Sequence, residues 1–410
     1  MNNPLPTPTP RRAAVFFIFV TIMLDMLSFG IIIPVLPTLV EEFTSGDTRQ
    51  AAEIYGLMGT AWAIMQFICS PIQGALSDRF GRRPIILLSN VGLGIDYMVM
   101  ALAPNLAWLF AGRVISGIAS SSFSTAGAYI ADVTSVNDRA AAFGKIGVAF
   151  GLGFVLGPAI GGLLGASDPR LPFWGAGITS LLNACYGYFV LPESLAPEKR
   201  MPFSWKRANP VGSLILLRSH HELFGLATAN FLTSLAHVVL PSVTVLYLGY
   251  RYGWGATTVG LTMAAVGVGA MIVQGALVKP ITARLGERRA LAVGLLCGAV
   301  GFCIYGFAPN GFVYCFGIPV MAFWGLTGPS AQSLMTRHVS HQEQGQLQGA
   351  IGSLMGIAGL IGPTIFTQTF ARFIAPESEW QLPGAPFLLA SMLLLAAMAI
   401  AWRATRPRAM

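Results

Sequence analysis

Long apolar stretches alternate with short polar ones along almost the whole chain. Each is long enough to cross the roughly 30 Å hydrocarbon core of a bilayer as a helix, so we expect twelve membrane-spanning helices. The expected spans cover residues 14–39, 54–76, 84–104, 106–132, 140–165, 171–191, 221–248, 256–280, 289–308, 312–336, 346–373 and 385–402. The pattern therefore predicts an all-α membrane protein.

The longest polar connection lies at the middle of the chain and is rich in Pro, Lys and Arg. We expect this segment, residues 192–220, to be a cytoplasmic linker between two six-helix halves, residues 14–191 and 221–402. Short cytoplasmic tails, residues 1–13 and 403–410, would complete the chain.

An internal repeat supports this division. Residues Arg79, Gly81, Arg83, Gly144, Gly157 and Pro158 return 205 positions later as Arg284, Gly286, Arg288, Gly349, Gly362 and Pro363. A constant offset at three separate places indicates a duplication. Two related halves around a site at the membrane midplane are the architecture of an alternating-access carrier, so we expect two pseudo-symmetric halves around a central cavity.

Composition and charge agree with a membrane location. Only 10% of the 410 residues are charged, against about 25% in soluble domains. With the N-terminus in the cytoplasm, 20 of the 25 Lys and Arg residues fall on that side and four on the other. This asymmetry predicts that both termini are cytoplasmic and explains the net charge of +8 without nucleic acid. We expect no cleavable signal peptide, because the first apolar segment is too long for one.

One carboxylate lies near the middle of the first expected span. Asp25 stands in a stretch from Ala14 to Leu36 that contains no Lys or Arg. A charged side chain at that depth costs at least about 2.5–3.5 kcal/mol. Because desolvation disfavours the ionised form, we expect Asp25 to take up and release a proton. The alternative is a carboxylate held in a salt bridge.

Two further charges fall inside the third and fourth spans. Asp96 lies near the membrane midplane, and Arg113 lies about two helical turns inside its span, where it needs a partner. We expect Asp25, Asp96 and Arg113 to form a proton-coupling group. The alternative for Arg113 is a static ion pair that stabilises the N-terminal half.

The first short cytoplasmic loop reads GALSDRFGRRP over residues 74–84. Gly74 and Gly81 permit a tight turn and close helix approach, and Asp78 can face a helix N-terminus or an arginine across the seam between the halves. We expect a latch that shuts the cytoplasmic side in one state and breaks in the other. Its expected members are Gly74, Asp78, Arg79, Gly81, Arg82, Arg83, Asp132 and Arg139. The alternative is a turn with basic anchors, which leaves Asp78 unexplained. The second copy has Ala283 in place of Asp78, so the latch would be asymmetric.

This loop resembles the signature of the major facilitator superfamily between its second and third helices. The fifth span resembles the antiporter signature of the drug-exporting branch through Gly153, Gly157, Pro158 and Gly161. Small residues four apart let helices approach closely, and a proline bends its helix. The alternative for these four positions is ordinary small-residue packing.

Nearly the whole chain is similar to the tetracycline-resistance exporters of the drug:proton antiporter branch. The similarity is carried by residues 24–37, 77–84, 96–97, 250–254 and 344–349. It implies proton-driven export of a drug-like compound, with Asp25, Asp96 and Arg113 as functional positions and Gln66 as a pocket glutamine.

The chain departs from those exporters in its C-terminal half. They carry a His in the eighth helix and an Asp in the ninth, where Ala270 and Gly298 stand here. Coupling would then depend on the N-terminal carboxylates. Further expected substrate contacts are Asn230, Phe231, His237, Phe323, Trp324 and Gln332. A lone helix histidine is more often a neutral hydrogen-bonding residue, and a membrane aromatic is more often packing.

These observations predict a monomeric antiporter of the bacterial inner membrane that exports an amphipathic, drug-like compound in exchange for protons, with tetracycline-like compounds among the candidates. The alternative is a proton symporter for a nutrient or metabolite in the same fold. The sequence shows no paired nucleophile and base, no His-rich cluster and no phosphate loop, so we expect neither an enzyme nor a metal or cofactor site.

Overall fold

A computed structural model describes residues 11–120, 122–134, 139–205, 221–339 and 343–406. Half of the expected linker, residues 206–220, and the outer parts of both tails lie outside the described residues. The division of the chain into two halves and a linker therefore remains a prediction.

The first six expected spans coincide with eight helices. These are α1 (Arg11–Ile32), α2 (Leu36–Phe43), α3 (Thr48–Phe80), α4 (Arg82–Ala101), α5 (Leu106–Ala119), α6 (Ser122–Val133), α7 (Arg139–Gly165) and α8 (Leu171–Val190). The first span breaks into α1 and α2, and the fourth into α5 and α6. A short 3₁₀ turn, η1 (Pro197–Lys199), follows α8.

The last six expected spans also coincide with helices. These are α10 (His221–His237), α11 (Val239–Tyr252), α12 (Ala256–Ile272), α13 (Val278–Phe307), α14 (Gly311–Ala322), α15 (Thr327–Thr336), α16 (Gln344–Ile374) and α17 (Ala385–Ala404). A π turn, η3 (Val273–Leu277), joins α12 to α13, and a 3₁₀ turn, η4 (Phe323–Leu326), joins α14 to α15. No strand occurs among the described residues, so the predicted all-α class is confirmed.

Several helices are long and apolar enough to span a membrane. By length and composition, eight segments of the described chain qualify. One of them, Ala256–Phe307, has 52 residues and covers two expected spans. The division falls at Gly286, whose φ of +75° interrupts α13. A left-handed φ costs glycine nothing, which explains why glycine stands at the turn between these spans.

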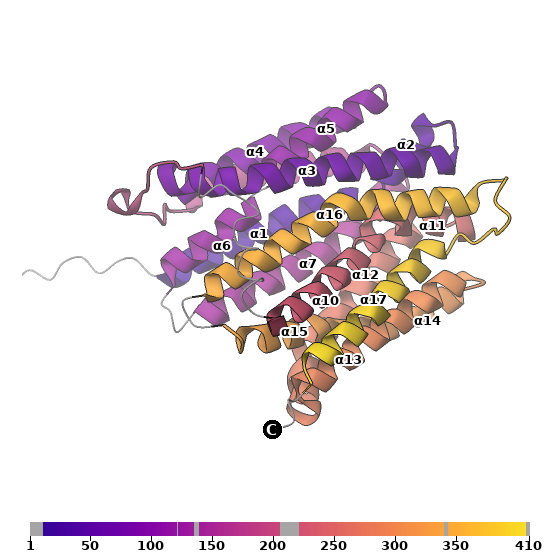
Figure 1. The fold of residues 1–410 in the computed structure, drawn as a ribbon. Coiled ribbons are helices and arrows are strands. Elements are labelled where there is room, and N and C mark those ends of the chain that lie inside the picture. Colours follow the sequence, from indigo (N-terminus) through magenta and orange to yellow (C-terminus); the bar gives the residue numbers. More distant parts are fainter. Residues whose placement is uncertain (1–10, 121, 135–138, 206–220, 340–342, 407–410) are drawn as a thin grey trace, which may run out of the picture.

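The helices form one elongated bundle with two distinct ends (Figure 1). We call the end that carries Arg82, Arg83 and Arg288 the basic end, and the opposite end, which carries Arg49, the far end. Figure 1 shows α3 and α16 side by side, with α2 and α11 both at the far end.

Two helix pairs make the most extensive contacts between the two parts of the bundle: α3 packs on α16, and α7 packs on α12. Both pairs are tightest toward the far end. A Cβ added to Gly162 of α7 would lie 2.5 Å from the Ala256 carbonyl oxygen, whereas one added to Gly144 or Gly147 would meet nothing within 4 Å. The two parts therefore contact closely toward the far end, and the stretch of α7 nearer the basic end has open space beside Gly144 and Gly147.

Candidate functional site

Three charged side chains gather inside the first part of the bundle. Asp25 on α1 and Arg113 on α5 are each only 7% exposed, and Asp96 on α4 is fully buried. The phenol ring of Tyr97 lies within electrostatic reach of all three. The helices thus bring together the three residues that the sequence analysis assigned to proton coupling.

The guanidinium of Arg113 packs against an aromatic ring of the neighbouring helix. Its guanidinium lies 5.3 Å from the centre of the Trp62 ring on α3, which is cation–π distance. The Nε of Arg113 has no hydrogen-bond partner. Asp96 is near enough to interact electrostatically with Arg113, but neither of its oxygens accepts a hydrogen bond of ordinary geometry. The proton-coupling role of Arg113 and the static ion pair both remain predictions.

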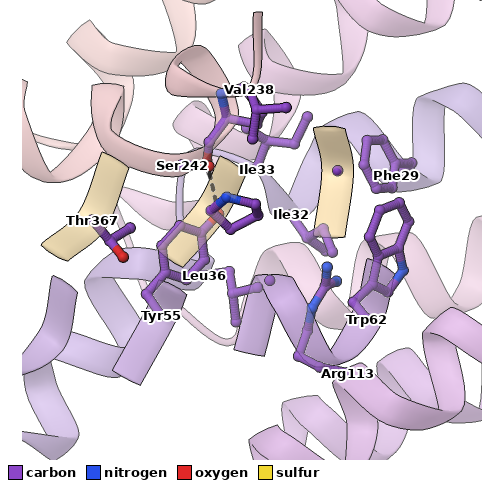
Figure 2. A pocket seen from close by; sticks show the side chains of 14 residues that line it. Phe29, Ile32, Ile33, Leu36, Tyr55, Trp62, Arg113, Val238, Ser242 and Thr367 are labelled. Carbon is purple, nitrogen blue, oxygen red and sulfur yellow. Dashed lines mark hydrogen bonds between the residues drawn. The ribbon is translucent and has the colours of Figure 1, made fainter. Parts of the chain in front are cut away.

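A cavity of about 150 Å³ lies between the two parts of the bundle, beside this charged group. Its walls come from α1, α2, α3 and α5 on one side and from α11 and α16 on the other. The lining residues are Phe29, Ile32, Ile33, Leu36, Tyr55, Gly59, Trp62, Arg113, Val238, Pro241, Ser242, Gly359, Pro363 and Thr367. Figure 2 shows Arg113 extending from its helix toward Ile32, beside the indole of Trp62.

The far end of the bundle is closed above this cavity by contacts between its two parts. The Tyr55 hydroxyl donates to the Pro241 carbonyl oxygen at 3.0 Å, and the hydroxyls of Thr60 and Thr364 share a hydrogen bond of 2.8 Å. At the outer edge, the Arg49 guanidinium lies 2.6 Å from a Glu377 carboxylate oxygen. These contacts therefore hold the two parts together on the far-end side of the cavity in this state.

All seven residues that we expected to contact the substrate lie outside this cavity lining. On α3, Gln66 donates from its amide to the Ser120 hydroxyl at 3.2 Å. The His237 ring at the end of α10 lies 5.5 Å from the Trp324 ring of η4. The lining residues do not include Gln66, Asn230, Phe231, His237, Phe323, Trp324 or Gln332. Their role in substrate binding remains a prediction.

At the basic end, the α3–α4 loop carries a network of charges. Arg82 pairs with Asp78 at 2.5 Å and with Asp132 of α6 at 3.1 Å, and it donates to the Ser77 hydroxyl at 2.7 Å. The Ser194 hydroxyl donates to Asp132 at 3.1 Å. Asp78 therefore pairs within its own half in this state, and no ion pair among the described residues joins it to the other half.

The family of the chain follows from comparison with known proteins. A sequence model of the Major Facilitator Superfamily matches residues 18–363. The chain belongs to the Major Facilitator Superfamily. The proteins and solved structures that it resembles are transporters rather than enzymes, and the chain is accordingly a multi-pass membrane transporter.

Tetracycline resistance proteins are among the relatives. The chain is 37% identical over 382 residues to the class C tetracycline resistance protein of Escherichia coli, covering 93% of this chain and 94% of that protein. It is 34% identical over 374 residues to the class G protein of Vibrio anguillarum, covering 90% and 93%.

Solved transporter structures share the fold. The human organic anion transporter MFSD10 (TETRAN) superposes with a TM-score of 0.71 at 26% identity, covering 96% of this chain and all of that one. A bacterial homologue of the human lysosomal transporter Spinster, captured inward-facing and unoccupied, superposes with a TM-score of 0.74 at 16% identity, covering 97% and 98%. At 16% identity, the similarity to the Spinster homologue shows a shared fold and nothing further.

Within this major facilitator fold, the turn at Gly81 is fixed by a residue that the sequence analysis missed. Gly81 has a φ of +104°, and a Cβ there would lie 2.3 Å from a Glu193 oxygen. That carboxylate accepts hydrogen bonds from the backbone N–H groups of Arg82 at 2.9 Å and Arg83 at 3.3 Å. Glu193 thus caps the N-terminus of α4 from just beyond the sixth span. No sequence pattern indicated this role, because Glu193 follows Pro192 outside any predicted helix.

One expectation for this loop was wrong. A Cβ added to Gly74 would meet nothing within 4 Å, so α3 has no close neighbour there. Instead Gly74 borders an open cleft of about 370 Å³ between α3 and α6, lined also by Asp78 and Thr125. The remaining arginines have local contacts: Arg79 lies 5.0 Å from the Phe80 ring, and Arg83 lies 5.5 Å from the Tyr188 ring. The side chain of Arg139 lies outside the described residues.

The C-terminal half of this major facilitator protein repeats the network with opposite polarity. At the 205-residue offset, Arg82 corresponds to Glu287 and Asp132 corresponds to Arg337. Glu287 and Arg337 form an ion pair of 2.5 Å. Arg288, the counterpart of Arg83, likewise holds the last helix of its half, with its guanidinium 4.0 Å from the Trp402 ring. The two halves therefore share the contact geometry while exchanging the signs of the pair.

The glycines of α7 provide the close approach that their spacing predicts. Added Cβ atoms would lie 2.6 Å from Met26 Cβ at Gly153, 2.6 Å from Gly30 Cα at Gly157, and 1.9 Å from the Ile31 carbonyl oxygen at Gly161. This face of α7 therefore packs directly on α1, the helix that carries Asp25. The bend expected at Pro158 leaves α7 continuous from Arg139 to Gly165. Whether these positions determine antiport remains a prediction.

Proposed function

We propose that the chain is a proton-coupled antiporter that exports an amphipathic, drug-like compound by alternating access. One observation carries the proposal: the buried carboxylates Asp25 and Asp96 lie beside Arg113 at a cavity built by both halves and closed at the far end. Exclusion from water favours the neutral form of each carboxylate, and the nearby guanidinium favours the charged form, so rocking of the halves can switch protonation. The tetracycline resistance proteins among the relatives support an exported drug.

We place the basic end in the cytoplasm of a bacterial inner membrane, with both termini on that side and the protein working as a monomer. The excess of Lys and Arg at the basic end supports this orientation. Single cysteines at exposed Trp380 or Met201, in a chain freed of its native cysteines, test it. We expect a membrane-impermeant maleimide added to intact spheroplasts to label position 380 and spare position 201. The opposite labelling would reverse the orientation.

Proton flux driven by drug addition tests the transport cycle. In energised inside-out vesicles from an efflux-deficient host, addition of a transported compound from a panel that includes tetracycline should release protons from the acidified lumen. We expect Asp25→Asn to abolish this release while inserted protein stays at the wild-type level. Glu379→Gln, an exposed loop carboxylate, is the matched control. Wild-type proton release from Asp25→Asn would overturn the coupling role, and accumulation of the compound by intact energised cells would indicate a symporter.

The pair of Asp78 with Arg82 within one half fits a latch that is released in this state. Closure of the basic end would bring this loop against the other half, where Asp78 could exchange partners. We expect Asp78→Asn to slow turnover several-fold while substrate binding to purified protein stays within about twofold of wild type. Unchanged turnover would remove the latch assignment.

A further inference from the structure

The charge of the cavity lining sets a limit on its ligand. Among the described residues that line the cavity, Arg113 is the charged one and none is a carboxylate. The described residues also include no group of three His, Cys, Asp or Glu side chains that could hold a metal ion. A ligand with a positive charge, or one bound as a metal chelate, would meet a like charge in a space shielded from water.

The unsatisfied polar groups of the lining are mainly donors. Arg113 is only 7% exposed, and its Nε has no hydrogen-bond partner. The indole N–H of Trp62 and the hydroxyl of Thr367 also lack hydrogen-bond partners. The Tyr55 hydroxyl already donates to Pro241. Because an N–H group can only donate, a ligand that satisfies Arg113 and Trp62 must present acceptors.

The remaining wall suits a planar ring. The Phe29 and Trp62 rings stack at 6.1 Å with an angle of 29° between their planes. Leu36, Val238 and Pro363 supply apolar surface. A cavity of about 150 Å³ has the size that accommodates one benzene-like ring.

We propose that this cavity binds an aromatic ring that carries oxygen acceptors and no positive charge, as a metal-free species. This inference rests on the proposed function in taking the cavity as the substrate site. In it Arg113 is a specificity-determining residue that donates to a carbonyl or enolate oxygen of the ligand, and Trp62 supplies both a ring face and a second donor.

Three probes of similar shape, each with one benzene ring, test the inference. They are acetophenone, which has a carbonyl acceptor, isopropenylbenzene, which has a methylene in its place, and benzylamine, which is a cation at neutral pH. Binding is measured by equilibrium dialysis against the full chain in lipid nanodiscs, with empty nanodiscs subtracted. We expect the ketone to bind at least about tenfold more tightly than the alkene, as a hydrogen bond from a charged donor provides, and the amine to bind weakest.

Variants separate a binding role for Arg113 from a structural one. Arg113→Met should bring the three affinities to within about threefold, whereas Arg113→Lys should still reject the amine because it keeps the charge. Trp62→Phe should weaken the ketone and leave the alkene unchanged. The matched controls are Arg372→Met and Trp380→Phe, which alter exposed residues outside the cavity. Size-exclusion profiles confirm that each variant is folded.

The inference is overturned if the amine binds wild-type protein as tightly as the ketone. It is equally overturned if the ketone preference survives in Arg113→Met, or if no probe binds above the nanodisc background. Drug-driven proton release, measured on the same preparation, keeps the two proposals apart. Intact proton release without the ketone preference would reject only the ligand class, and an Arg113-dependent preference without proton release would reject only the antiport.

Discussion

At the scale of single residues, the most informative side chain is Glu193. Its carboxylate accepts hydrogen bonds from the first backbone N–H groups of α4, donors that have no partner within the helix itself. It also accepts from its neighbour Leu195 at 3.0 Å, which fixes the carboxylate in place. A carboxylate at a helix N-terminus also interacts favourably with the helix dipole. One residue from the end of the sixth span therefore holds the turn on which Asp78 and Arg82 depend.

We expect Glu193→Ala to lower the free energy of unfolding by about 0.5–2 kcal/mol, the usual cost of losing a helix cap. Glu193→Gln keeps an acceptor oxygen and should lose less. The thermal unfolding midpoint of detergent-purified protein measures both effects. Glu198→Ala, an exposed glutamate in η1, is the control and should leave the midpoint unchanged. Equal midpoints for the alanine variants at 193 and 198 would show that the cap contributes nothing.

At the scale of the helices, the contact between α7 and α1 depends on the absence of side chains. Gly153, Gly157 and Gly161 recur every four residues, so all three lie on one face of α7 and the backbone of α1 occupies the space that side chains would fill. The neighbouring Gly162 faces α12 instead. One helix thus contacts both the element that carries Asp25 and the other half of the bundle.

We expect Gly161→Ala to disrupt this contact, because the added methyl would lie 1.9 Å from the Ile31 carbonyl oxygen and the backbone must shift. The amount of folded protein should fall, and drug-driven proton release from the folded remainder should be lost. The matched control is Gly147→Ala on the same helix, where a Cβ meets nothing. That variant should gain up to about 1 kcal/mol through helix propensity. Equal behaviour of the two variants would contradict the packing argument.

The positions of the helices could be predicted from the sequence, but the faces that line the cavity could not. Apolar stretches located every span, and the repeat located the turns at Gly81 and Gly286. In a bundle surrounded by lipid, however, apolar residues occur all round a helix, so periodicity does not distinguish an inner face. The sequence therefore indicated Arg113, whose charge is conspicuous, and missed Tyr55 and Trp62. The break between α5 and α6 also left no clear signal, because that span stays apolar throughout.

At the scale of the whole molecule, the closed far end defines the state of the transporter. Arg49 and Glu377 pair across the seam at the surface, and the hydroxyl contacts of Tyr55 and Thr60 lie beneath them. These contacts join helices of both halves and must break before the cavity can open to that side. The ion pair is exposed to solvent, so its contribution to closure is small.

The pH dependence of the Arg49–Glu377 ion pair follows from the pKa of the Glu377 carboxylate. Hydrogen bonds from its own backbone N–H and from the Arg49 guanidinium lower the pKa of Glu377 below its ordinary value. Because the pKa of Glu377 is lower in the closed state than its ordinary value of about 4.3, the ionised carboxylate favours closure at any pH above that ordinary value. This contribution is lost as the pH falls through the lowered pKa of the closed state. We therefore expect the Glu377 ion pair to contribute equally to far-end closure at pH 8 and pH 5, and to lose this contribution only in stronger acid.

Spin labels at positions 50 and 379, in a chain freed of native cysteines, measure the closure as an inter-label distance. Glu377→Gln should shift the distribution toward longer distances at every pH between 5 and 8. Glu42→Gln, another exposed far-end carboxylate, should leave it unchanged. A wild-type distribution that already lengthens between pH 8 and pH 5 would assign the pH response to another group.

The exchanged signs of the two basic-end pairs also bear on the ancestry and engineering of the chain. Suppose that both halves descend from one ancestral segment with an Arg–Asp contact. If that contact became a Glu–Arg contact by reversing one charge at a time, the intermediate would hold two like charges in contact. Such an intermediate is penalised, so the two positions changed together, through neutral residues, or while the contact was absent. The halves are consequently not exchangeable modules. A chimera that grafts the Glu287 turn onto the first half would set Glu against Asp132, and only a matching Asp132→Arg substitution would restore the attraction.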